Sequence, residues 1–146
     1  IQNAPRYTAA GFIILLDFLG LILGIPFYPE FMVYTYNTSI WPALLWVALV
    51  IFAPAFEETW FRGFLFAGFR QSRIGVYGTI GLTALLWALS HIQYGIYGIT
   101  TIFVMGLLFG IARFKTDSLW SPLLMHGLIN FVATLQVAIN MNSIVS

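Results

Sequence analysis

The chain has 146 residues, of which 60% are hydrophobic and 8% are charged, and its formal net charge is +1. Soluble domains carry about 25% charged residues, so the composition excludes a soluble globular domain and predicts an integral membrane protein. Six Lys and Arg residues without a basic stripe argue against nucleic acid as a partner. The absence of cysteine excludes disulfides, thiolate nucleophiles and Cys-based metal sites.

The apolar stretches, in chain order, predict an all-α polytopic bundle of about five transmembrane helices in a single domain, residues 1–146. A helix that crosses a bilayer needs roughly 17–25 apolar residues. Stretches of about this length cover residues 8–27, 40–56 with a continuation to about 69, 74–91, 96–112 and 119–140.

Two glycine pairs have the spacing that lets helices approach closely, Gly20-x-x-x-Gly24 and Gly106-x-x-x-Gly110. We expect them to pack inside the bundle, with dimerisation as the alternative.

Basic residues in the short connections predict the orientation of the chain, because cytoplasmic loops carry an excess of Lys and Arg. Alternating five spans places one set of basic residues on the same side: Arg6, Arg70, Arg73, Arg113 and Lys115. We therefore expect a cytoplasmic N-terminus and an external C-terminus.

Ionisable residues inside a span are costly in lipid and need a partner or a function. Asp17 interrupts the first span and is interpreted as a carboxylic acid hydrogen-bonded to a neighbouring helix. Glu58 and Arg62 lie four positions apart on one helix face, with Glu first, which is the favourable order. Glu57 lies roughly 140° around the helix from Arg62. We expect a structural Glu58–Arg62 ion pair and an uncompensated Glu57, which is typical of a reactive carboxylate.

Two histidines and an asparagine complete the polar set. His91 ends the stretch 74–91, and His126 and Asn130 lie four positions apart on one face of the last span. Each has a structural interpretation: His91 as an interfacial or core imidazole, and His126 with Asn130 as a polar clasp between helices. Together with Glu57 they suit hydrolysis. A carboxylate and an imidazole can activate water, and an imidazole and an amide can stabilise an oxyanion.

At these positions the sequence resembles the CPBP family (also called Abi or CAAX-protease family) of glutamate-dependent intramembrane proteases. The resemblance covers about residues 54–131. Three family motifs occur in order: Glu-Glu-x-x-x-Arg at Glu57, Glu58 and Arg62, aromatic-x-x-x-His at Trp87 and His91, and His-x-x-x-Asn/Asp at His126 and Asn130.

The resemblance implies that Glu57 is a general base working with His91, and that His126 and Asn130 form an oxyanion hole. Glu58, Arg62 and Trp87 would support these residues, and no metal is implied. The family usually has Phe at the position of Trp87, a change expected to alter the shape of the pocket more than its chemistry. Family members also commonly have more helices before the motif core, so the N-terminal part of the fold is expected to be shortened.

The depth at which His91 would lie in the membrane leads to an expectation about the residues before it. Counted at about 1.5 Å per residue from Ile74, His91 would lie near the outer face and Glu57 near the inner one. An interfacial amphipathic segment near residues 63–78 would move the start of the third span to about Gly81. We expect this arrangement, a cavity open to the cytoplasm, and Glu57 and His91 within about 10 Å of each other, since a base needs hydrogen-bond or one-water reach.

The leading hypothesis is an intramembrane endopeptidase of the CAAX prenyl endopeptidase type, which cleaves a membrane-associated or lipidated substrate without a cofactor. A metal-dependent version would hold one divalent metal, such as zinc, at Glu57, His91 and His126, with water as the fourth ligand. A different class is a non-catalytic membrane subunit that assembles a partner complex or confers bacteriocin immunity. A proton-coupled transporter fits poorly, because the spans lack two-fold internal symmetry. Expected partners are membrane lipid, a peptide or lipidated protein substrate and, for the subunit, a membrane-complex partner.

Overall fold

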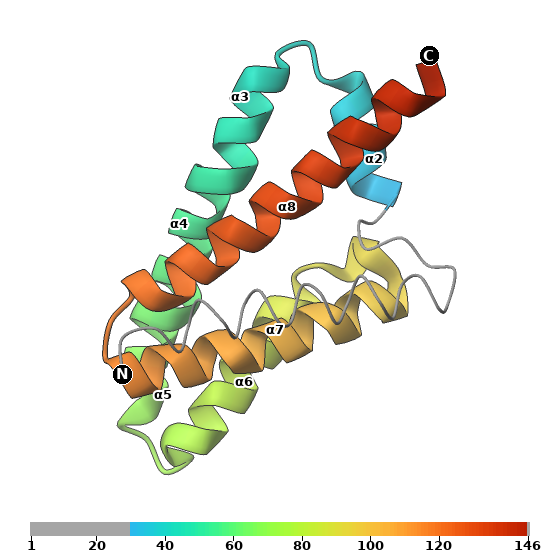
Figure 1. Ribbon diagram of the computed structural model, residues 1–146. Helices are drawn as coiled ribbons and strands as arrows, with labels where there is room; N and C mark the ends of the chain where they lie inside the picture. Colours follow the sequence, from blue (N-terminus) through green and yellow to red (C-terminus); the bar gives the residue numbers. More distant parts are fainter. Residues whose placement is uncertain (1–29, 146) are drawn as a thin grey trace. The chain divides into compact units, whose positions relative to one another are not determined.

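The computed structural model describes residues 30–145, and within this range the chain consists of helices and short connections without a strand (Figure 1). In chain order the elements are α2 (Glu30–Thr38), α3 (Pro42–Val47), a π-helical segment (Ala48–Phe52), α4 (Ala53–Glu58), a second π-helical segment (Thr59–Leu65), α5 (Phe66–Arg70), α6 (Gly75–Leu89), a 3-10 turn (Ile92–Tyr94), α7 (Gly95–Thr116) and α8 (Trp120–Val145). The expected all-α fold is confirmed.

Three of the described helices are long and apolar enough to cross a membrane: Pro42–Arg70, Ile92–Thr116 and Trp120–Asn140. Many large apolar side chains on them are exposed, among them Leu44, Phe64, Ile96, Leu124 and Ile139. Exposed aliphatic and aromatic surface on this scale suits contact with lipid tails. The chain is therefore an integral membrane protein.

The third expected span, residues 74–91, is shorter than predicted. It forms the apolar helix α6 of 15 residues, which extends over roughly 22 Å at about 1.5 Å per residue and so is shorter than a hydrocarbon core of about 30 Å. The first expected span, with Asp17 and Gly20-x-x-x-Gly24, lies outside the described residues.

The chain divides into two compact units. One contains the described residues 30–52 and 125–145, and the other is Ala53–Leu124. The boundaries fall inside two helices, after Phe52 and after Leu124. The prediction of a single domain over residues 1–146 stays a prediction.

In the unit Ala53–Leu124, helices α6 and α7 pack along each other, as Figure 1 shows. A Cβ atom added at Gly106 would lie 2.9 Å from Ala84 Cα, and one at Gly110 would lie 3.0 Å from Ile80. At Gly106 the backbone of the facing helix leaves no room for a side chain, and at Gly110 an added Cβ would press on the Ile80 side chain. The prediction that the Gly106-x-x-x-Gly110 pair packs inside the protein is therefore confirmed.

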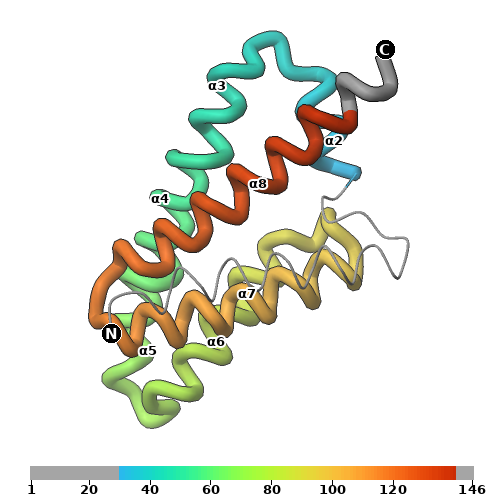
Figure 2. The backbone as a smooth tube through the Cα atoms, in the orientation of Figure 1, coloured from blue at the N-terminus to red at the C-terminus, as the bar shows by residue number. Residues whose placement is uncertain are grey.

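The segment expected near residues 63–78 does not form a separate helix, and its position at the membrane interface stays a prediction. Residues 63–70 complete the helix that begins at Pro42, a turn follows, and α6 begins at Gly75 with a φ of 63°, which suits glycine (Figure 2). Glu57 lies roughly 20 Å along its helix from Arg70, and His91 lies roughly 24 Å along the chain from Gly75. The helical segment from Glu57 to Arg70 and the segment from Gly75 to His91 thus have similar lengths and are joined by a short turn. Glu57 and His91 therefore lie at a similar distance from this turn.

The other unit is held together by contacts of α8 with the segment that follows α2. The rings of Trp46 and Phe131 meet edge to face with centroids 5.5 Å apart. At Gly127, an added Cβ would lie 3.1 Å from the Val50 carbonyl oxygen. Backbones this close allow a short polar side chain on α8 to reach the main chain of the π-helical segment Ala48–Phe52.

Candidate active site

The buried ion pair expected between Glu58 and Arg62 is present. Arg62 Nη1 donates a hydrogen bond to Glu58 Oε1 over 2.9 Å, and both side chains are fully buried. Arg62 Nη2 also donates to the Gly106 carbonyl oxygen over 3.2 Å. A charged pair in this environment needs such additional bonds, because desolvation of both ions is costly.

The guanidinium group of Arg62 also lies against two aromatic rings. Its Cζ atom is 4.5 Å from the ring centroid of Trp87 and 5.3 Å from that of Phe109. The rings of Trp87 and Phe109 contact each other with centroids 5.4 Å apart. Cations over aromatic faces are attracted to the ring, most strongly where water is excluded. Arg62 thus links α7 to the indole of α6.

Glu57 points to different partners from its neighbour Glu58. Trp87 Nε1 donates a hydrogen bond to Glu57 Oε2 over 2.5 Å. The side chain of Glu57 is 22% exposed, whereas that of Glu58 is fully buried. Two adjacent carboxylates therefore have different environments, and only Glu57 is open to a water molecule or a substrate.

His91 lies one turn after Trp87 and faces Glu57. Its Nδ1 lies 2.9 Å from the Trp87 carbonyl oxygen. Because a carbonyl oxygen can only accept, Nδ1 donates to it, and in the neutral ring Nε2 then carries the lone pair. Nε2 lies 3.9 Å from Glu57 Oε2. This distance is too long for a direct hydrogen bond, but one water about 2.8 Å from each atom would bridge them.

Asn130 belongs to the other unit and has a main-chain partner there. Its Nδ2 donates to the Leu49 carbonyl oxygen over 2.8 Å. In a π-helical register this carbonyl would pair with the N–H of residue 54. Position 54 is proline, which has no N–H, so the asparagine amide supplies the missing donor. One N–H of the amide is used in this way, and the second is left for another acceptor.

His126 is buried, with 4% of its surface exposed, and lies one helical turn before Asn130 on α8. The structure thus brings Glu57, Trp87 and His91 together in one unit and holds His126 and Asn130 on one helix of the other. A single site formed by all of these residues stays a prediction, and so does the zinc alternative at Glu57, His91 and His126.

Trp87 supplies a hydrogen-bond donor that was not predicted from the sequence, while the expectation that it alters the shape of the pocket more than its chemistry stays a prediction. Phenylalanine cannot donate a hydrogen bond, whereas the indole N–H of Trp87 donates to the candidate base. The signal was available in the sequence, because Trp in place of Phe adds one donor at a motif position.

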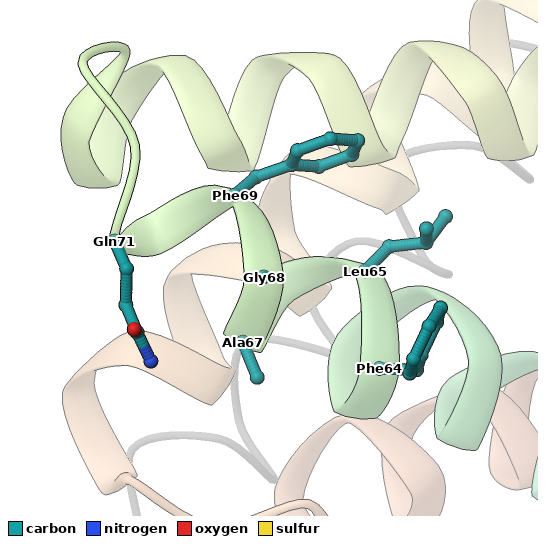
Figure 3. A pocket seen from close by; sticks show the side chains of 6 residues that line it. All are labelled: Phe64, Leu65, Ala67, Gly68, Phe69 and Gln71. Carbon is teal, nitrogen blue, oxygen red and sulfur yellow. The ribbon is translucent and has the colours of Figure 1, made fainter.

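An open apolar hollow lies elsewhere in the same unit (Figure 3). Its lining residues come from the end of the long helix and the turn that follows: Phe64, Leu65, Ala67, Gly68, Phe69 and Gln71. None of these is a candidate site residue. The cavity expected beside Glu57 and open to the cytoplasm stays a prediction.

The fold and the site define a helical membrane protein with a partly exposed carboxylate–imidazole pair next to a buried ion pair. A family model described as Type II CAAX prenyl endopeptidase Rce1-like matches residues 39–132, a range that contains every candidate site residue. The chain belongs to this Rce1-like family, which confirms the resemblance seen in the motifs.

One relative was found in Escherichia coli, a protein described as an uncharacterized 24.3 kDa protein. It is 34% identical over 113 residues, which amount to 74% of this chain and 51% of that protein. The chain therefore spans about half the length of this curated relative. No solved structure gives a significant match.

Proposed function

We propose that the chain is an intramembrane endopeptidase that hydrolyses a peptide bond of a membrane-associated or lipidated substrate. The observation that supports this proposal is the facing pair Glu57 and His91, with 3.9 Å between Oε2 and Nε2. Membership of the Rce1-like family supports the same class of reaction.

In the proposed reaction, one water lies between Glu57 Oε2 and His91 Nε2 and donates a hydrogen bond to each. Because the water uses its two hydrogens for these bonds, the lone pairs of its oxygen are free to attack the carbonyl carbon of the substrate. As the new C–O bond forms, Glu57 takes the proton from the water. When the tetrahedral intermediate collapses, the C–N bond breaks and Glu57 returns this proton to the leaving nitrogen.

Negative charge develops on the carbonyl oxygen during the attack. We assign its stabilisation to His126 and to the second N–H of Asn130, because an imidazole and an amide can both donate to an oxyanion. The first N–H of Asn130, bound to the Leu49 carbonyl oxygen, would hold the amide in a fixed orientation. Preorganised donors of this kind contribute about 10²–10³ in kcat.

The test is the Glu57→Gln variant, which keeps the shape of the side chain but cannot act as a base. We expect the rate of cleavage to fall by about 10²-fold or more. The full chain, in lipid nanodiscs, would be given a panel of quenched fluorescent peptides with a C-terminal Cys-aliphatic-aliphatic-X sequence, either farnesylated, geranylgeranylated or unprenylated. Cleavage is followed by fluorescence, and the bond cut is identified by mass spectrometry.

The matched control is Glu30→Gln, which removes an exposed carboxylate at the start of α2 and is expected to leave cleavage unchanged. Equal cleavage by Glu57→Gln and the wild type would disprove the assignment of Glu57 as the base. Insensitivity of the wild type to a chelator separates water activation by Glu57 from the zinc alternative, which predicts loss of activity. If no peptide is cut and Glu57→Gln leaves the cellular phenotype intact, the non-catalytic subunit becomes the better hypothesis.

A further inference from the structure

Trp87 contacts both members of the Glu57–His91 pair. Its indole Nε1 donates to Glu57 Oε2, and its main-chain carbonyl oxygen accepts from His91 Nδ1. The carboxylate oxygen that it holds is the same oxygen that faces His91 Nε2. One residue therefore sets the position of the carboxylate through its side chain and the orientation of the imidazole through its backbone.

The indole itself is held in place. The Trp87 side chain is buried, with 2% exposure, and contacts both the Arg62 guanidinium and the ring of Phe109, which also contact each other. Arg62 is in turn fixed by its ion pair with Glu58 and its hydrogen bond to the Gly106 carbonyl oxygen. The Glu58–Arg62 ion pair is thus connected to Glu57 indirectly, through the Trp87 ring that Arg62 contacts and whose N–H donates to Glu57.

We propose that Trp87 is a positioning residue for Glu57: its indole N–H holds Oε2 at the distance from His91 Nε2 that one water spans. A carboxylate oxygen has two lone pairs, so Oε2 can accept from the indole and still accept from the water. Phenylalanine at this position would retain the packing against Arg62 and Phe109 but leave the carboxylate free to rotate. This inference rests on the proposed function only for the role of the water; the hydrogen bond itself is independent of catalysis.

The hydrogen bond is tested without any substrate. The full chain, labelled with ¹⁵N at its five tryptophans and placed in nanodiscs, should show one indole N–H resonance that disappears in Trp87→Phe. We expect this resonance to move upfield in Glu57→Gln, because a neutral amide oxygen accepts more weakly than a carboxylate. The resonance of Trp60, whose ring stacks on Phe64, serves as the reference and should stay in place. A Trp87 resonance unaffected by Glu57→Gln would overturn the proposal even if the chain is a protease.

The effect on catalysis is tested with two variants at position 87. Trp87→Phe removes the N–H and part of the ring. Incorporation of β-(3-benzothienyl)alanine removes only the N–H and keeps the shape, so it decides the result if Trp87→Phe folds poorly. We expect kcat to fall about tenfold with KM within about twofold, since a lost charge-assisted hydrogen bond corresponds to at least this factor.

Trp60→Phe is the matched control, because Trp60 is in the same unit but is 47% exposed, and its kinetics should not change. An unchanged kcat in the benzothienyl variant, or a rise in KM alone, would overturn the positioning role and indicate a contact with substrate instead. If the wild type cleaves none of the peptides, the proposed function fails on its own account, and the NMR shift still decides whether Trp87 holds Glu57.

Discussion

At the scale of single residues, two adjacent glutamates differ because of the direction in which each points. Glu58 is buried against Arg62, while Glu57 is partly exposed and lies between Trp87 and His91. Helical periodicity predicted which glutamate pairs with the arginine. It could not predict the indole donor, because that contact joins α4 to α6 across 30 positions of sequence.

The Glu58–Arg62 pair leads to a prediction about stability. Glu58→Gln removes the negative charge of Glu58 and leaves the buried guanidinium of Arg62 without its ion-pair partner. Breaking such a pair costs about 3–5 kcal/mol, whereas replacing both members with neutral groups costs less. Thermal unfolding in detergent should therefore show a larger decrease in melting temperature for Glu58→Gln than for the double variant Glu58→Gln/Arg62→Met. A loss in the double variant equal to the sum of the losses in Glu58→Gln and in Arg62→Met would contradict this account.

At the scale of elements, the long helix Pro42–Arg70 contains the main departure from the sequence prediction. Two π-helical segments flank α4 and its glutamates. Apolar periodicity predicted a helix here but could not distinguish π from α turns. The type of turn depends on which N–H group each carbonyl oxygen accepts from. Pro54 was the available signal, since its missing N–H leaves the ladder incomplete. The donor that completes it, Asn130, lies 81 positions from Leu49.

The close packing of α6 and α7 gives a second prediction. Gly106→Ala places a methyl group 2.9 Å from Ala84 on the facing helix, and overpacking of this kind costs about 1–3 kcal/mol. Gly81→Ala is the matched control, because nothing lies within 4 Å of an added Cβ there. It should be neutral or stabilising by up to about 1 kcal/mol, from the helix propensity of alanine. Equal melting temperatures for the two variants would show that the Gly106 contact does not limit the packing.

At the scale of the whole molecule, the orientation in the membrane remains a prediction from the basic loops. The chain has no cysteine, so single cysteines report on one site each. In cells, Asn37→Cys near the end of α2 should react with a membrane-impermeant maleimide added outside. Gln71→Cys, in the turn between α5 and α6, should react only after permeabilisation. The reverse pattern would show that the chain has the opposite topology.

The sequence by itself determined that the chain is a helical membrane protein, which residues form the three motifs and which glutamate pairs with Arg62. These features depend on composition and on spacing within one helix, where 3.6 residues per turn relates position directly to direction. Tertiary structure decided that α6 starts at Gly75, that His91 reaches the level of Glu57, and that the Trp87 indole holds the carboxylate. Each of these depends on where a helix ends and on how closely two helices pack. Both are determined by contacts between side chains that lie far apart in the chain.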